Sequence, residues 1–195
     1  MQLTTARLLL REFVESDREA VRHYQSDPLY TRYHPFDHPT EQDAREFVGR
    51  FLEQQQEQPR RKFQFAISDP TDGRLIGNCG LRITDHFTEA GMCEADIGHE
   101  LDSRCWGRGY ATEAAREMLR FGFVEHGLHR ISAGCVADNV GSVRVLEKIG
   151  MRLEGRLREN KFFKGRSWDS LLYAILNREW QAHQLSPSND VGGAV

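Results

Sequence analysis

A loop with two glycines and two arginines precedes the clearest amphipathic pattern in the chain. Residues 104–111 read Arg-Cys-Trp-Gly-Arg-Gly-Tyr-Ala. Gly107 and Gly109 lack the Cβ atoms that would hold a phosphate away from the backbone, and two arginines, Arg104 and Arg108, add positive charge. Such a loop, when it leads into a helix, offers backbone N–H groups and the positive end of the helix dipole. The residue types therefore predict a site for an anion such as a pyrophosphate.

Two common phosphate-binding motifs do not describe this loop. A P-loop needs a Gly-Lys-Ser/Thr sequence, which the chain lacks. The dinucleotide fingerprint needs Gly or Ala at position 112, where the chain has Thr112. A nucleotide-phosphate site on another α/β fold and a tight turn without any ligand remain as alternatives.

A second polar segment follows the next predicted strand. Residues 138–142 read Asp-Asn-Val-Gly-Ser, and Asn139 has the residue type of a helix N-cap. Taken alone, Asn139 would only cap the helix and Ser142 would only fill its first turn. Together with the glycine loop, however, this segment places two helix starts directly after two strands, about 30 residues apart.

The elements that must position these residues follow from apolar periodicity. Alternation of Phe63, Phe65 and Ile67 predicts a strand, and helical spacing from Ala111 to Phe123 predicts an amphipathic helix. We predict one α/β (α+β) domain over residues 1–183, with a mixed, mostly antiparallel central sheet flanked by helices and a flexible tail over 184–195. The predicted strands cover residues 7–11, 63–67, 75–83, 95–101, 131–136, 153–161 and 167–176; Gly77 and Gly80 predict a bulge. The other predicted helices cover residues 16–25, the segment from Thr40 that ends before Pro59, and 139–149.

Composition excludes several classes of protein. The net charge of −3 lacks the basic excess of a nucleic-acid-binding protein. The longest apolar runs, such as residues 171–176, are far shorter than the ~18 residues of a membrane span. The four cysteines show no Cys-x-x-Cys spacing and the eight histidines no His-Glu-x-x-His motif, so we predict no metal site. Scattered thiols without an export signal indicate a reduced, cytoplasmic protein.

The two polar segments together resemble the GNAT acetyltransferase superfamily. Its signature loop, Arg/Gln-x-x-Gly-x-Gly/Ala, matches Arg104, Gly107 and Gly109, and the resemblance continues through Asn139-x-x-Ser142 and residues 146–151. Residues 5–11, Thr-Ala-Arg-Leu-Leu-Leu-Arg, and the spacing Gly165, Asp169, Tyr173 resemble the branch of ribosomal-protein N-terminal acetyltransferases, the RimJ/RimL-like proteins. The resemblance covers nearly the whole chain.

The resemblance implies an acetyl-CoA-dependent N-acetyltransferase. The strand over residues 96–101 would splay from the strand that begins near Ile131, and the pantetheine arm would lie in the gap. The loop N–H groups would hold the pyrophosphate, and Asn139 would hydrogen-bond the arm. The residues that the resemblance assigns to acetyl-CoA are His99, Glu100, Leu101, Arg104, Cys105, Gly107, Arg108, Gly109, Tyr110, Ala111, Thr112, Asn139 and Ser142.

Catalysis needs a free amine, because an ammonium group has no lone pair for attack. Many superfamily members place a tyrosine acid four residues after the position of Ser142; this chain has Leu146 there. Ser142 is then the candidate to contact the leaving sulfur, and a backbone N–H near residues 97–98 would stabilise the carbonyl oxygen. Asp96 ranks first and Glu159 second as the base, ahead of Glu94 and a relay through His99. An ion-paired or solvated role is the alternative for each.

The acceptor is an amine whose identity the sequence leaves open. A protein N-terminus and a small-molecule amine are both compatible with the resemblance, as is a homodimer. We expect the acceptor site to be lined by loop residues Tyr30, Tyr33, His34, Phe36, Asp85, His86 and Phe87. The carboxylates of Asp37, Asp85 and Glu89 would attract a cationic amine to its entrance. A non-catalytic acyl-CoA-binding module on the same fold is the alternative to an enzyme.

Overall fold

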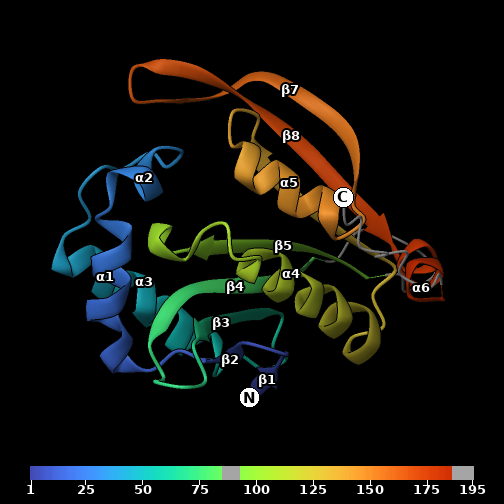
Figure 1. The fold of residues 1–195 in the computed structure, drawn as a ribbon, viewed down its shortest axis with the longest axis horizontal. Coiled ribbons are helices and arrows are strands. Elements are labelled where there is room, and N and C mark those ends of the chain that lie inside the picture. The colour runs from blue at the N-terminus through green and yellow to red at the C-terminus, as the bar shows by residue number, and fades with distance from the viewer. Residues whose placement is uncertain (85–92, 186–195) are drawn as a thin grey trace, which may run out of the picture.

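An open sheet of eight strands runs through the protein (Figure 1). The structure is a computed structural model, and it describes residues 1–84 and 93–185. The strand order is β1-β2-β3-β4-β5-β6-β8-β7; β5 and β6 are parallel, and the other neighbouring pairs are antiparallel. The strands are β1 (Gln2–Thr4), β2 (Leu9–Glu12), β3 (Lys62–Ser68), β4 (Leu75–Thr84), β5 (Glu94–Leu101), β6 (Arg130–Val136), β7 (Arg152–Phe163) and β8 (Arg166–Leu176).

Helices cover both faces of this sheet. They are α1 (Arg18–Gln25), α2 (Pro28–Thr31), α3 (Glu41–Gln54), α4 (Tyr110–Arg120), α5 (Val140–Lys148) and α6 (Asn177–Leu185). In β3 the side chains of Phe63, Phe65 and Ile67 join the larger core, which contains the buried residues of α4. Ala66 points the other way, into a smaller core built with α1 and α3. The predicted mixed α/β domain is confirmed.

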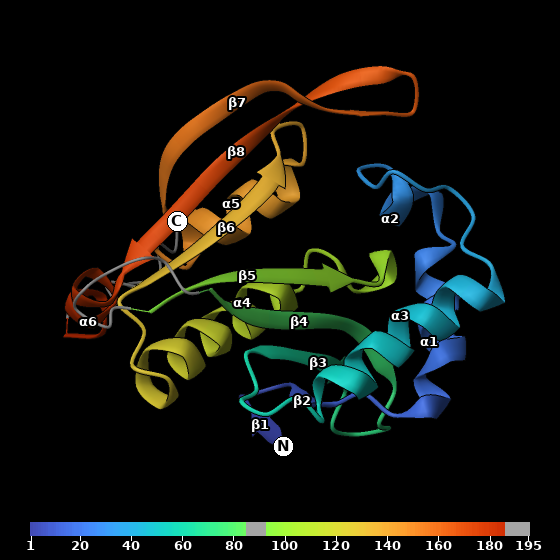
Figure 2. The same ribbon diagram turned by 180° about the vertical axis from the view of Figure 1, so that it is seen from behind.

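The pairing between β5 and β6 stops after three residues. Glu94, Ala95 and Asp96 pair with Arg130, Ile131 and Ser132, and there the ladder ends. Beyond this point the two strands diverge (Figure 2), while β5 keeps its full pairing with β4 and β6 with β8. Residues 97–101 are therefore bonded into the sheet on one side only. The splay that the resemblance implied is confirmed.

Three elements lack the apolar periodicity that would predict them from the sequence. β1 has three residues, α2 has four, and α6 buries no side chain, so none of them shows an apolar repeat long enough to detect. α6 reaches Leu185, so the first two residues of the expected tail are helical; residues 186–195 lie outside the described part.

Glycines explain two other local differences. Helix α4 ends at Arg120 and continues as a π-helical turn over Phe121–Glu125, where a Cβ on Gly122 would lie 2.6 Å from Ile131. The predicted bulge lies at Gly77, opposite the register shift between Ile67 and Ser68. Gly80 instead keeps regular pairing, and the side chain of Gln64 fills the space where its Cβ would lie.

Candidate active site

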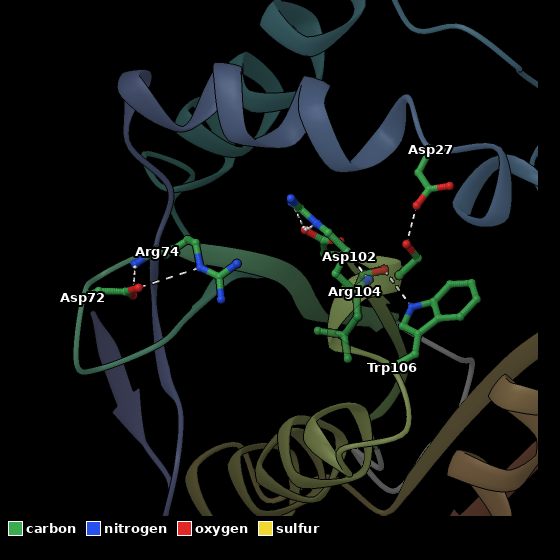
Figure 3. A network of polar contacts seen from close by, with 8 residues as sticks. Asp27, Asp72, Arg74, Asp102, Arg104 and Trp106 are labelled. Carbon is green, nitrogen blue, oxygen red and sulfur yellow. Dashed lines mark hydrogen bonds and ion pairs between the residues drawn. The ribbon is translucent and has the colours of Figure 1, made fainter.

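The glycine loop is fixed to the end of β5 by a buried carboxylate. Asp102 accepts the backbone N–H of Arg104 at 3.0 Å and also binds its guanidinium, with Nε at 3.0 Å (Figure 3). The hydrogen bonds from Arg104 hold the pKa of Asp102 below its ordinary value. The indole N–H of Trp106 donates to the carbonyl of Leu101 at 3.0 Å. These contacts set the direction in which the loop leaves the strand.

Gly107 and Gly109 have the backbone geometry of an anion cradle. Both are left-handed, with φ of +75° and +81°, and Gly109 is the N-cap of α4. No described residue accepts a hydrogen bond from the N–H of Gly107, Arg108 or Gly109. The first-turn N–H groups of α4, from Tyr110 to Thr112, point the same way by helix geometry. The residues predicted to hold a pyrophosphate therefore fit such a group.

A clamp from the N-terminus, which the sequence did not reveal as a functional feature, holds this loop. Glu113 in α4 accepts hydrogen bonds from the hydroxyl of Thr5 at 2.6 Å, from the N–H of Arg7 at 2.8 Å and from Arg7 Nε at 2.7 Å. Arg7 also donates to the carbonyl of Arg108 at 3.0 Å, and its guanidinium lies over the ring of Tyr110. The only sequence signal was the resemblance of residues 5–11 to one branch of the superfamily.

The second polar segment forms the start of α5. Asn139 is the N-cap, and its Oδ1 accepts the N–H of Ser142 at 3.1 Å. The Nδ2 of Asn139 has no partner among the described residues, so it is available to a ligand. Burial raises the pKa of the Cys135 thiol in β6, although a hydrogen bond with Ser142 opposes this shift. The predicted helix cap is confirmed, and Ser142 contacts the part of β6 that has separated from β5.

The other residues predicted for acetyl-CoA fall into two groups. Leu101 and Cys105 are buried in the core, and burial raises the pKa of the Cys105 thiol, which suits a packing role. His99 also points to the core side of β5, where burial lowers its pKa. Glu100 lies on the opposite face of the strand.

The two base candidates do not lie together. Asp96 stands where β5 and β6 separate and forms an ion pair with Arg82 of β4. Glu159 is exposed in β7, where its N–H donates to Asp169 at 2.8 Å. Three strand spacings separate β7 from β5, which is about 14 Å or more. Glu94 is bound to Arg130 at 3.3 Å.

Two cavities of opposite charge flank the end of β5. A cavity of about 610 Å³ is lined by Arg22, Arg74 and Arg104 together with two carboxylates, beside the glycine loop. A cavity of about 790 Å³ is lined by Tyr30, Phe36 and Glu100, with residues of α1 and α3. Three of the predicted acceptor-site residues, Tyr30, Phe36 and Asp37, thus line the larger cavity. Asp85, His86, Phe87 and Glu89 lie outside the described residues.

This arrangement can hold an extended ligand with an anionic end. The loop and the basic cavity suit phosphates. The opening between β5 and β6 offers unpaired strand backbone on its β5 side, and on its β6 side Ser142 contacts Cys135. The described residues contain no group of three or more His, Cys, Asp or Glu side chains that could hold a metal ion. No helix in the described ranges is long and apolar enough to cross a membrane.

Known proteins share this arrangement. Residues 7–152 match the acetyltransferase (GNAT) domain family. An uncharacterized N-acetyltransferase of Bacillus subtilis, YnaD, is 38% identical over 180 residues, which cover 92% of this chain and 99% of YnaD. A GNAT-family acetyltransferase from Bacillus anthracis has a solved structure with a TM-score of 0.76 and 35% identity, over 92% of this chain and all of that one.

A solved structure with lower sequence identity supports the fold assignment alone. The ribosomal L7/L12 α-N-protein acetyltransferase RimL, solved in complex with coenzyme A, gives a TM-score of 0.76 at 18% identity, over 90% of this chain and 98% of that chain. The family match and the relative YnaD decide the assignment, because each covers most of this chain. The protein belongs to the GNAT acetyltransferase family and is an N-acetyltransferase.

Proposed function

We propose that the protein transfers the acetyl group of acetyl-CoA directly to a primary amine while both substrates are bound. The observation that carries this proposal is the opening between β5 and β6. It connects the unpartnered N–H groups of the glycine loop with the start of α5. The neighbour RimL was solved with coenzyme A, which agrees with the use of a CoA thioester as the acyl donor.

On the donor side, the chain would bind three parts of the thioester. The loop from Cys105 to Ala111 would hold the pyrophosphate with its N–H groups, and Arg104 and Arg108 would add positive charge. The free edge of β5 over residues 97–101 would pair with the pantetheine arm. The unpartnered amide Nδ2 of Asn139 would donate to the same arm. When bound, acetyl-CoA supplies an activated acyl group, so no covalent intermediate on the protein is needed.

Near the thioester, Ser142 and Asp96 are the candidates for proton handling. The hydroxyl of Ser142 would donate a hydrogen bond to the departing thiolate, because Leu146 is buried in the core and offers no acid. Asp96 would take the amine proton, directly or through water, from its place at the point of strand separation. Its ion pair with Arg82 orients the carboxylate. Glu159 would serve as base only for an acceptor that reaches β7.

We further assign the protein to the RimJ/RimL-like branch, as the residues at 5–11 and the fold of RimL support. The long outer strand β7 has one unpaired edge among the described residues, which would suit pairing in a homodimer. No disulfide joins the four cysteines, all of which lie in the described part, and this agrees with a reducing compartment such as the cytoplasm.

The test is release of CoA thiol from acetyl-CoA in the presence of amines. The panel would contain N-terminal peptides beginning with Ala, Ser, Asp or Met, beside polyamines and aminoglycosides. We expect turnover that falls at least tenfold in Ser142→Ala and in Asn139→Ala. Arg144→Ala, an exposed change on the same helix, serves as the matched control and should retain activity.

Two results would contradict the proposal. Calorimetry that detects no binding of acetyl-CoA would exclude the donor site. Tight binding without turnover on any acceptor would favour the alternative, a non-catalytic acyl-CoA-binding module. Peptide turnover alone would instead point to a protein N-terminus as the acceptor.

A further inference from the structure

The larger cavity lies beside the unpaired end of β5, on the face away from α4. Its volume of about 790 Å³ is within the usual range of small-molecule sites, roughly 300–1,000 Å³. α1, the loop after α2, and α3 form its walls, and β5 contributes Glu100. The glycine loop does not line it. The cavity is therefore separate from the region that fits the phosphates.

Glu100 is a carboxylate without a counter-ion in this cavity. Its Oε2 accepts the hydroxyl of Tyr30 at 2.7 Å and the amide Nδ2 of Asn78 at 2.8 Å, and both donors are neutral. Within residues 1–84 and 93–185, no cation pairs with Glu100 and nothing donates to its Oε1. A half-buried carboxylate is costly unless a positive group compensates it. The structure thus provides a place for a cation.

The groups around Glu100 do not neutralise it. His34 stacks on Tyr30 with ring centroids 4.6 Å apart, and burial lowers the pKa of His34, so the imidazole is neutral near pH 7. Burial and the charge of Glu100 raise the pKa of Tyr30 far above its ordinary value, so the phenol keeps its proton and remains a donor. The stacked rings of Tyr30 and His34, with Phe36 beside them, form an aromatic wall that suits an ammonium group.

The lining of the larger cavity as a whole is negatively charged, like Glu100 itself. Five carboxylates and three guanidinium groups line it. Two of those guanidinium groups, on Arg18 and Arg45, pair with Glu15 and Glu41 outside the lining. One carboxylate, that of Asp37, likewise pairs with Lys164 outside the lining, which leaves four carboxylates and one guanidinium group. The smaller cavity beside the glycine loop is instead dominated by arginines. An amine cation would therefore enter the larger cavity, and a phosphate the smaller one.

The position of Glu100 along β5 sets its distance from the expected place of transfer. Asp96, Gly98 and Glu100 share one face of the strand, opposite Arg82, Gly80 and Asn78. Gly98 leaves the backbone open between the two carboxylates, since a Cβ there would meet only the guanidinium of Arg82, at 3.5 Å. Two residues of strand span about 7 Å, from the expected place of transfer near Gly98 to Glu100.

We propose that Glu100 binds a second ammonium group of the acceptor, and that the substrates are slender aliphatic amines with two or more positive charges. This inference rests on the proposed transfer of acetyl to an amine. One amine of the acceptor lies near Gly98 and Asp96 and reacts, while the other lies against Glu100 and the ring of Tyr30. A linker of about four carbon atoms between two nitrogens spans the distance along β5. Glu100 is a specificity-determining residue in this arrangement and takes no proton from the reacting amine.

The experiment compares 1,4-diaminobutane with butylamine as acceptors, in wild type, Glu100→Gln and Tyr30→Phe. We expect kcat/KM of the wild type to favour the diamine by about tenfold or more, the factor for one charged hydrogen bond. Glu100→Gln should reduce this preference to within about twofold, mainly through KM of the diamine, with KM for acetyl-CoA unchanged. Tyr30→Phe keeps the ring and should give an intermediate preference. Glu125→Gln removes an equal charge from an exposed site outside the cavity and should leave the preference intact.

Calorimetric titration of 1,4-diaminobutane into the protein separates this inference from the proposed function. Binding to wild type that weakens about tenfold in Glu100→Gln supports the site even if no acetyl group is transferred, and that combination would overturn the proposed function alone. Equal preference for the two amines in wild type would overturn the role of Glu100. So would a preference that survives in Glu100→Gln, or the absence of diamine binding to folded wild type.

Discussion

The clamp between the N-terminus and α4 predicts how Glu113→Gln should behave. The carboxylate of Glu113 is 16% exposed and receives the hydroxyl of Thr5 as well as the backbone and guanidinium N–H groups of Arg7. Glutamine keeps one oxygen but loses the charge. A hydrogen bond to a charged group contributes about 1.5–3 kcal/mol. Because the side chain of Arg7 is 49% exposed, we expect a loss of about 1–2 kcal/mol in the free energy of unfolding.

The same substitution should also weaken the binding of CoA. Arg7 donates to the carbonyl of Arg108 at 3.0 Å, so a loosened Arg7 leaves the glycine loop with one anchor fewer. One neutral hydrogen bond is worth about 1 kcal/mol, which corresponds to about fivefold in Kd. Glu113 itself does not line either cavity beside β5. The effect on CoA would therefore act through the loop.

Glu117→Gln provides the matched control. Glu117 is one turn further along α4, is 13% exposed and binds Arg120 at 2.9 Å, so it loses a comparable ion pair away from the loop. Urea unfolding would measure the stability of both variants, and calorimetry their affinity for CoA. We expect both to be destabilised and only Glu113→Gln to bind CoA more weakly. Equal CoA affinity in the two variants would refute the reasoning.

The pH dependence gives a second check on the clamp. Burial tends to raise the pKa of Glu113, but the hydrogen bonds from Thr5 and Arg7 outweigh it and the pKa is lowered. A carboxyl group whose pKa is lowered by folding stabilises the protein above its unfolded pKa, about 4.3, and this contribution disappears as pH falls through the folded value. The difference in stability between wild type and Glu113→Gln should thus be constant near pH 7 and shrink below about pH 4.

Other predictions follow from the loop and the core. Gly109→Ala places a Cβ at φ +81° and 3.3 Å from the guanidinium of Arg7, so it should cost about 1–2 kcal/mol in unfolding experiments and weaken CoA binding in calorimetry. Leu146→Ala, in the buried core, should cost about 2–5 kcal/mol in urea unfolding. Arg104→Ala removes the partner that lowers the pKa of Asp102, so the acid unfolding midpoint should shift to higher pH, as circular dichroism can follow.

The local geometry of the proposed donor side was predictable because its residues are close in sequence. The glycine loop and the cap at Asn139 are local features, and glycine, N-cap and periodicity rules apply within a few residues. The structure gives Gly107 and Gly109 left-handed backbones and makes Asn139 the N-cap of α5. The N-terminal clamp escaped detection, because Arg7 and Glu113 are 106 positions apart and neither has a local signature.

The acceptor side was less accessible to sequence analysis for the same reason. Glu100, Tyr30 and Asn78 belong to three elements, and only the fold brings them together. The resemblance assigns Glu100 to acetyl-CoA and implies no role for its side chain toward the acceptor. The alternation of buried Ala95, Ile97 and Leu101 places the side chain of Glu100 on the opposite face, so the strand pattern contains that information.

One structural feature links the two sides of the proposed site. Where β5 leaves β6, one edge of β5 becomes free, while the face of the strand that carries Asp96 also carries Glu100, which lines the acidic cavity. A continuous parallel pair would close the edge and remove the donor site. A side chain at Gly98 would extend from the same face between the two carboxylates. In the proposed mechanism, transfer at this point would depend on a free edge and a bare backbone in the same strand, with the anionic donor and the cationic acceptor entering from different cavities.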